Sequence, residues 1–165
     1  MNFRSLSVLA AAVILLAACK QSPETSANTS GATNTAGAAS SAASGPAKGS
    51  REDFIQNVGD RVYFDFDKSD IKPEGQQTLE RQATWLKQYP NVTVTVEGHC
   101  DERGTREYNL ALGNRRAVAA KNALVALGVS ADRIKTISYG KDRPIVVGSN
   151  EAAWAQNRVD ITVIN

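Results

Sequence analysis

The residues with the clearest chemical potential lie in one short stretch, GHCDERGTREYNLALGNRRA, at residues 98–117. It holds the single histidine of the chain, His99, directly before Cys100 and Asp101. A histidine beside a cysteine is the composition of a thiol nucleophile with its base, and together with the aspartate it is also a set of metal-binding residue types. Acidic and basic residues in the same stretch suit a charged clamp for a small ligand as well.

Neither catalysis nor metal binding fits this spacing well. His99 and Cys100 are neighbours at the end of a predicted strand, where consecutive side chains point to opposite faces and cannot share a hydrogen bond. A closed zinc site normally draws spaced pairs of ligands from separate turns, and not three adjacent residues. We therefore expect no catalytic residue, no metal and no cofactor. A periplasmic hydrolase that uses His99 and Cys100 is the weaker alternative.

Asp101, Asn109 and Arg116 indicate a binding site instead. Asp101 directly follows the predicted strand and Arg116 lies near the start of a long predicted helix, so a chain that returns antiparallel brings the two together. Opposite charges a few ångströms apart bind a zwitterion, the carboxylate taking an ammonium group and the guanidinium a carboxylate. Free amide groups at a helix start near Asn114 would add donors for that anion. Alternatively, Asp101 caps its own loop and Arg116 is an exposed charge or pairs with Glu107.

Patterns of apolar residues indicate the elements that position these groups. Alternation of apolar and polar residues predicts four strands, at residues 61–66, 92–99, 134–139 and 159–164. Helical spacing predicts three helices, at residues 73–89, 106–128 and 151–157. Gly113 and Asn114 suggest that the second helix breaks into two pieces. The order β, α, β, α, β, short α, β predicts an α+β domain with helices on one face of a four-stranded mixed sheet.

The first 50 residues have the character of export and attachment segments. Residues 1–18 place Arg4 ahead of an apolar run of about 13 residues, shorter than the ~20 of a membrane-spanning helix, which is typical of a secretory signal peptide. Residues 16–19, LAAC, resemble a bacterial lipobox, which implies that Cys19 is acylated; a secreted protein without lipid is the alternative. Residues 20–50 lack aromatic and large aliphatic side chains, which predicts a flexible tether.

The remaining residues, 51–165, have the length of one domain. They contain as many lysines and arginines as aspartates and glutamates, which argues against nucleic acid as a partner. Once Cys19 is modified, Cys100 has no second cysteine in the chain to pair with, so we expect no disulfide.

Four motifs resemble, in order, those of the OmpA-like peptidoglycan-binding domain: VYFDFDKSDI, VTVEGHCDERGTREYNLALGNRRA, VSADRI and ISYGKDRP. The resemblance covers residues 61–165 and is specific to the peptidoglycan-associated lipoproteins of that family. It implies that the ligand is the peptidoglycan stem peptide, recognised at meso-diaminopimelate, whose side chain ends in an ammonium and a carboxylate. By position, Asp101 would meet the ammonium and Arg116 the carboxylate, while Asn109 would hold the loop. Further pocket residues would be Leu112, Arg103, Phe64, Asp65, Phe66 and Asp67.

The same resemblance implies a location and partners. Acyl chains on Cys19 would hold the outer membrane, the tether at residues 20–50 would span the gap, and the domain would face the periplasm and grip the cell wall without enzymatic activity. Lys20, directly after the lipobox cysteine, favours outer-membrane delivery. The implied protein partners are TolB and other Tol proteins of the envelope-spanning system used during division. A lipoprotein that binds peptidoglycan outside the Tol system is the alternative.

Overall fold

The computed structural model describes residues 45–165. The predicted signal peptide at residues 1–18, the lipid-bearing Cys19 and most of the predicted tether lie outside the described residues.

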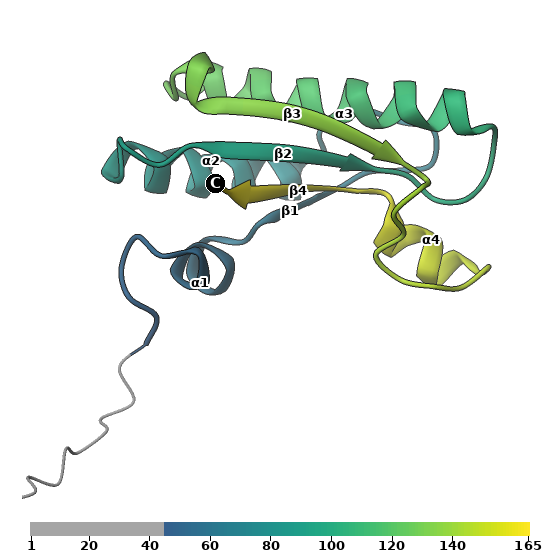
Figure 1. The fold of residues 1–165 in the computed structure, drawn as a ribbon, viewed down its shortest axis with the longest axis horizontal. Helices are drawn as coiled ribbons and strands as arrows, with labels where there is room; N and C mark the ends of the chain where they lie inside the picture. The colour runs from purple at the N-terminus through teal and green to yellow at the C-terminus, as the bar shows by residue number, and fades with distance from the viewer. Residues whose placement is uncertain (1–44) are drawn as a thin grey trace, which may run out of the picture. The chain divides into compact units, whose positions relative to one another are not determined.

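A four-stranded mixed sheet forms the framework of the described part (Figure 1). Its strands lie in the order β1-β4-β2-β3. β2 and β3 are parallel, whereas β4 pairs antiparallel with both β1 and β2. The mixed sheet that the sequence predicts is therefore confirmed. The bounds of the strands are β1 (Arg61–Tyr63), β2 (Val94–His99), β3 (Ile134–Gly140) and β4 (Val159–Ile164).

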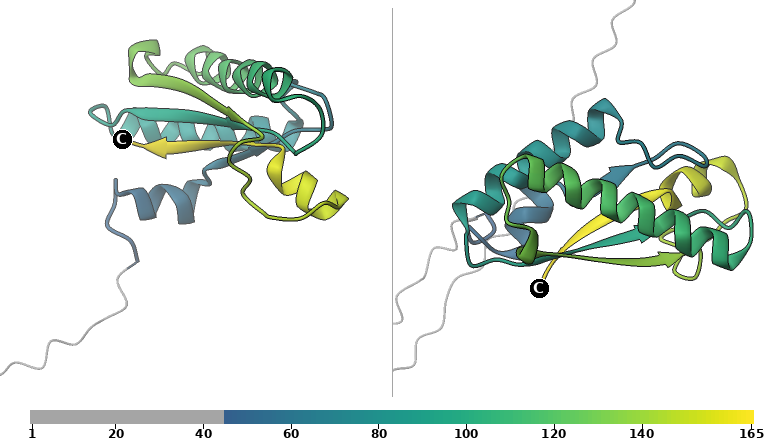
Figure 2. Two further views of the ribbon diagram at one scale, coloured as in Figure 1. Left: turned by 45° about the vertical axis from the view of Figure 1, so that its right-hand side comes forward. Right: turned by 90° about the horizontal axis from the view of Figure 1, so that it is seen from above.

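Two long helices, α2 (Pro73–Gln88) and α3 (Arg106–Ala126), cover one face of this sheet (Figure 2). Pro73 opens α2 at its first turn, and Thr105 caps α3 by accepting the N–H of Tyr108. The apolar stripes of the helices and the alternating valines of β2 meet in a core that includes Leu79, Leu86, Val94, Val96 and Leu124. The short helix α4 (Glu151–Asn157) lies at the end of the sheet where β4 begins (Figure 1).

The predicted break in the second long helix is wrong, because α3 runs without interruption from Arg106 to Ala126. Gly113 serves close packing and not helix termination. A Cβ atom built on Gly98 of β2 would lie 2.1 Å from the carbonyl oxygen of Gly113, so both positions need glycine for α3 to approach the sheet this closely. Since no helix starts near Asn114, the free amide groups expected there are absent, and Arg116 lies in the middle of α3.

A helical segment ahead of β1 was not predicted from the sequence. It consists of α1 (Arg51–Asp53), continued by the π-helical turn η1 (Phe54–Val58). Asp53 fixes it to α2, because its Oδ2 accepts the indole N–H of Trp85 at 2.8 Å and the backbone N–H of Gly49 at 2.9 Å. The folded part therefore also includes Gly49, just before residue 51, whose backbone N–H donates to Asp53.

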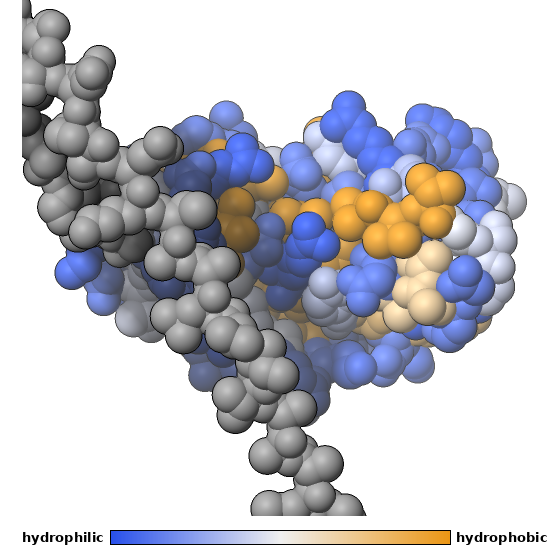
Figure 3. All heavy atoms as spheres, turned by 90° about the horizontal axis from the view of Figure 1, so that it is seen from below, coloured by the Kyte–Doolittle hydropathy of each residue, from blue (hydrophilic) through white to orange (hydrophobic). Residues whose placement is uncertain are grey.

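The face drawn in Figure 3 is largely hydrophilic where it is visible, with a hydrophobic area across part of it. Exposed apolar side chains of the described residues include Val146 and Val147, in the segment between β3 and α4. Scattered exposed apolar residues are normal for a folded domain. Within residues 45–165, none of the helices combines the length and the hydropathy of a membrane span.

Candidate functional site

Asp101 is the charged group at the centre of the candidate site. It follows β2 directly and is 4% exposed. Its Oδ1 accepts the backbone N–H and the Nε–H of Arg103, both at 3.2 Å. Its Oδ2 accepts Nη2 of Arg103 at 2.6 Å and Nη1 of Arg158 at 3.3 Å. Burial opposes ionisation, but these hydrogen bonds outweigh it and hold the pKa of Asp101 below its ordinary value, so the group is a carboxylate at neutral pH.

The side chain of Arg103 connects this carboxylate to two aromatic rings. Its guanidinium carbon lies 4.0 Å from the ring centre of Phe66 and 4.2 Å from that of Trp154. Phe66 comes from the loop between β1 and α2 (residues 64–72), whereas Trp154 lies in α4 and donates its indole N–H to Glu102 at 3.0 Å. Arg103 thus joins three segments that are far apart in the sequence.

Arg116 is fully buried and holds backbone together. Its Nε donates to the carbonyl oxygen of Lys68 at 2.7 Å, its Nη1 to that of His99 at 2.9 Å, and its Nη2 to that of Asp65 at 3.1 Å. Burial lowers the pKa of this guanidinium, and acidic groups nearby, Asp101 among them, oppose that effect. Arg116 is therefore not an exposed helix charge but ties the β1–α2 loop to the end of β2.

A pocket of about 150 Å³ opens beside Asp101, between the loop after β2, the start of α3 and the β1–α2 loop. A cavity near 150 Å³ admits a group about as large as benzene, which corresponds to the end of one amino-acid side chain and is too small for a sugar chain. Its polar lining includes carboxylates and a guanidinium, so the pocket suits a small ligand that carries both charges. The lining residues are Phe66, Asp67, Cys100, Asp101, Arg103, Gly104, Tyr108, Asn109 and Leu112.

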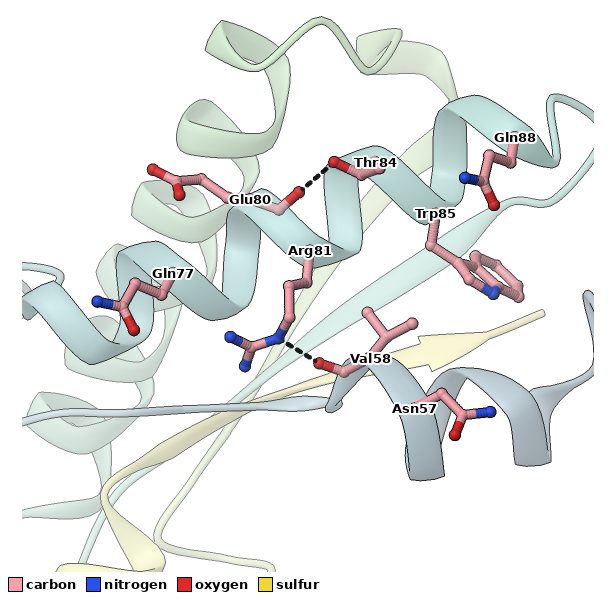
Figure 4. Close-up of a pocket in the computed structure, with 8 residues that line it drawn as sticks. All are labelled: Asn57, Val58, Gln77, Glu80, Arg81, Thr84, Trp85 and Gln88. Atoms are coloured by element: carbon pink, nitrogen blue, oxygen red, sulfur yellow. Dashed lines mark hydrogen bonds between the residues drawn. The ribbon is translucent and has the colours of Figure 1, made fainter. Parts of the chain in front are cut away.

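A larger hollow of about 480 Å³ lies between η1 and α2 (Figure 4). Its charged lining residues are Glu80 and Arg81, and Arg81 already donates to the carbonyl oxygen of Val58 at 3.0 Å and to the hydroxyl of Thr78 at 3.0 Å. It contains none of the residues selected from the sequence. We place the candidate site at the smaller pocket because a buried charge meets open space there.

His99 and Cys100 face different neighbours. Nδ1 of His99 lies 3.0 Å from the carbonyl oxygen of Arg143, its ring packs on Tyr139, and burial lowers its pKa. The thiol of Cys100 donates to the carbonyl oxygen of Asn109 at 3.4 Å, and burial raises its pKa to about 11. The thiol is therefore protonated at neutral pH. The two side chains share no hydrogen bond among the described residues, whereas a thiol nucleophile needs contact with its base.

The model of the OmpA family matches residues 63–158. The chain belongs to the OmpA family. Its relatives include the peptidoglycan-associated lipoprotein of Agrobacterium fabrum, which is 58% identical over 116 residues, with 70% of this chain and 66% of the relative covered. The protein of the same name from Brucella melitensis is 55% identical over 117 residues, with 71% of this chain and 70% of the relative covered. The predicted grouping with the peptidoglycan-associated lipoproteins of the OmpA family is thereby confirmed.

A solved relative supports the fold of this OmpA-family chain. The crystal structure of the peptidoglycan-associated lipoprotein from Burkholderia pseudomallei matches with a TM-score of 0.64 and 40% identity. The match covers 67% of this chain and 98% of the solved one. The OmpA-like fold expected from the sequence motifs, with helices on one face of a four-stranded mixed sheet, is confirmed.

Most of the residues expected at the OmpA-family site line the pocket: Asp101, Arg103, Asn109, Leu112, Phe66 and Asp67. The other three, Phe64, Asp65 and Arg116, do not line it. The buried Phe64 lies under Arg116, with 4.9 Å between its ring centre and the guanidinium carbon, and Asp65 contributes its backbone carbonyl. Asp101 also caps its own loop, as the alternative interpretation proposed, by accepting the N–H of Arg103.

Sequence reasoning missed Tyr108, Trp154 and Arg158. Tyr108 lines the pocket and donates its hydroxyl to Asp67. Its position four residues before Leu112 on one helix face was a usable signal. Arg158 and Trp154 gave no such signal, because they reach Asp101 and Arg103 from more than fifty residues away.

Asp160 on β4 is a buried carboxyl group that this site does not explain. It is 1% exposed, and neither oxygen has a hydrogen-bond partner within the described residues. Burial raises its pKa well above the ordinary value, although the charge of Arg116 opposes the rise. The folded protein therefore binds this proton more tightly than the unfolded chain does. Its contribution to stability is greatest below the unfolded pKa and is lost as the pH rises through the folded pKa.

We accordingly expect Asp160→Asn, which does not titrate, to gain stability relative to the wild type as the pH rises above 4. The gain should be on the order of 1 kcal/mol or more, since an ionised carboxylate without partners is costly to bury. Urea unfolding of both proteins at several pH values measures it. A stability difference that stays constant with pH would show that Asp160 does not titrate in this way.

Proposed function

We propose that the protein binds peptidoglycan without covalent chemistry, by holding the ammonium and carboxylate of a meso-diaminopimelate side chain at the pocket beside Asp101. The observation that carries the proposal is a buried, ionised carboxylate in the wall of a pocket sized for one side-chain end. The names of relatives at 55–58% identity support peptidoglycan as the polymer. The protonated thiol of Cys100 and the separation of His99 from it favour binding over hydrolysis.

In this proposal Asp101 receives the ammonium group and Arg116 the carboxylate. Of the five N–H donors of Arg116, four have acceptors. The fifth, on Nη2, has none among the described residues. The ligand's carboxylate accepts this fifth N–H. It also replaces carbonyl oxygens of the β1–α2 loop as an acceptor for Arg116. Asn109 keeps the loop after β2 in place, because its Nδ2 donates to the carbonyl oxygens of Arg103 at 2.8 Å and Thr105 at 3.0 Å. Leu112 forms an apolar wall.

Affinity for two matched peptides tests this proposal. A stem peptide with meso-diaminopimelate should bind the purified protein at least ~10-fold more tightly than its lysine counterpart, because lysine lacks the distal carboxylate and its charge-assisted hydrogen bonds. Isothermal titration calorimetry on both peptides measures the difference. Equal affinities would contradict the zwitterion site, and failure to bind either peptide would contradict the proposed function as a whole.

The proposal extends to the segments before the domain. Residues 1–18 direct export, acyl chains on Cys19 hold the outer membrane, and residues 20–50 give the domain at residues 51–165 its reach to the cell wall. Two attachments on one chain raise the effective concentration of each, so individually weak contacts suffice. Replacing Cys19 with serine should move the protein from the membrane fraction to the periplasmic fraction, and an unchanged distribution would exclude lipid anchoring.

Membership of the Tol system, with TolB as direct partner, is the part of the proposal that rests most fully on family resemblance. A pull-down with TolB, competed by peptidoglycan fragments, tests it. Capture that the fragments reduce would support a TolB surface that overlaps the pocket. Absence of capture would favour an OmpA-family lipoprotein that acts outside the Tol system.

A further inference from the structure

We propose that Arg103 is a specificity-determining residue of the pocket, in addition to Arg116. In this structure its guanidinium occupies the place of the ligand's ammonium at Asp101, and on binding it turns to the ligand's carboxylate, which it shares with Arg116. This inference rests on the proposed function and assigns to Arg103 a role beyond lining the pocket. It follows from the capacity of Asp101, from the different environments of its two arginines, and from the stacking of Arg103.

The hydrogen-bonding capacity of the Asp101 carboxylate is fully used in this structure. A carboxylate offers about four acceptor sites, and Asp101 already accepts four hydrogen bonds, three from Arg103 and one from Arg158. With 4% of the residue exposed, water offers no further route to its oxygens. An incoming ammonium group can therefore bind Asp101 only if an existing donor leaves.

Arg103 is the donor that leaves. The side chain of Arg158 is 9% exposed, and its other donors are fixed to the carbonyl oxygen of Phe64 at 3.2 Å and to Glu151 at 2.8 Å. The side chain of Arg103 is 31% exposed, and all its side-chain hydrogen bonds go to Asp101, with Glu151 at 3.9 Å as a looser ionic neighbour. If Arg103 leaves Asp101, solvent can stabilise its guanidinium. If Arg158 left, its guanidinium would stay buried without the carboxylate that pairs with it.

Stacking keeps the displaced guanidinium at the pocket. Phe66 and Trp154 stack on the flat faces of the Arg103 guanidinium, whereas its N–H groups, which donate the hydrogen bonds to Asp101, lie along its edge. The edge can turn away from Asp101 while the faces keep their aromatic contacts. A ligand that places an ammonium on Asp101 brings its own carboxylate to the same pocket, and the freed edge of Arg103 matches that carboxylate in a two-pronged geometry.

This exchange discriminates between ligands. A zwitterion replaces the bond between Arg103 and Asp101 with two new charge pairs. A ligand with an ammonium alone breaks that bond and leaves Arg103 without a carboxylate. Discrimination therefore depends on Arg103 competing for Asp101 when the site is empty, and it should weaken when this competitor is removed.

Binding of the two stem peptides to Arg103→Ala tests the inference in the full mature chain. The preference for the diaminopimelate peptide over the lysine peptide should fall roughly tenfold from its wild-type value, since one charge-assisted contact to the carboxylate is lost. Affinity for the lysine peptide should not fall, because the ammonium no longer competes with Arg103 for Asp101. Arg106→Ala is the matched control, as it also removes an arginine near the start of α3, but one that pairs with Asp142 outside the pocket.

Two outcomes would overturn the inference. Equal loss of affinity for both peptides in Arg103→Ala would mean that Arg103 only supports the fold, and an unchanged preference would mean that it does not contact the carboxylate. Arg103→Lys adds a second readout, because it keeps the charge but lacks the planar fork and should show an intermediate preference. If the wild type binds neither peptide, the proposed function fails, and that result is distinct from either outcome in the variants.

Discussion

Peptidoglycan binding by Asp101→Ala is expected to fall by roughly 30-fold or more, which corresponds to the ~2–5 kcal/mol lost when one partner of a buried, hydrogen-bonded charge pair is removed. The ammonium of the ligand would enter the pocket without a carboxylate to receive it. Titration of the purified variant with the diaminopimelate stem peptide measures the loss. Wild-type affinity in this variant would remove Asp101 from the proposed site.

The variant also leaves the buried guanidinium of Arg158 with fewer partners, so its thermal midpoint should fall as well. Binding must therefore be measured at a temperature where circular dichroism shows the fold intact. Asp132→Ala is the matched control. Asp132 lies in η2 (Ala131–Arg133), directly before β3, and because β2 and β3 are parallel it is at the end of the sheet opposite Asp101. Its peptide affinity should equal that of the wild type.

Arg116→Met is expected to lower the free energy of unfolding by about 3–5 kcal/mol, the range measured when one partner of a buried charged network is removed. Methionine keeps most of the apolar stem but leaves the carbonyl oxygens of Asp65, Lys68 and His99 without their donor, and buried acceptors without donors are costly. The midpoint of urea unfolding measures the change.

The neighbouring arginine provides the control for this substitution. Arg115 is exposed on the same helix, so Arg115→Met should change the free energy of unfolding by no more than ~0.5 kcal/mol. Comparable small effects in both variants would show that the bonds of Arg116 do not support the fold. A loss of ligand binding in Arg116 variants is informative only where the fold is shown to be intact.

The elements with strict local patterns were predictable from the sequence. The strand at residues 159–164 and the short helix at residues 151–157 have the bounds that alternation and capping indicate. The strand predicted at residues 61–66 ends earlier, at Tyr63, because the chain turns into the loop that packs on Arg116. Local patterns identify a strand, but they do not show where it ends when its end is set by a side chain far away in the sequence, as Arg116 does for β1.

The remaining errors concern contacts between distant segments. Gly113 resembled a helix break because its contact with Gly98 on β2 has no trace in local spacing. The burial of Arg116 could not be inferred either, since charged residues are mostly exposed and two of its three backbone acceptors lie about fifty residues away in the chain. The candidate pocket was found through motifs, whereas the support that Arg158 gives to Asp101 required the folded structure.

The place of β4 has a consequence for how the chain matures. The last strand of the sequence lies between β1 and β2, so β1 has no other partner in the sheet. A polypeptide made or exported from its N-terminus cannot join its first strand to the rest until residues 159–164 have emerged. β1 therefore stays unpaired until then, and long-range pairing of this kind slows folding and prolongs exposure of apolar surface. A holdase chaperone that binds exposed apolar segments would find its client in this interval.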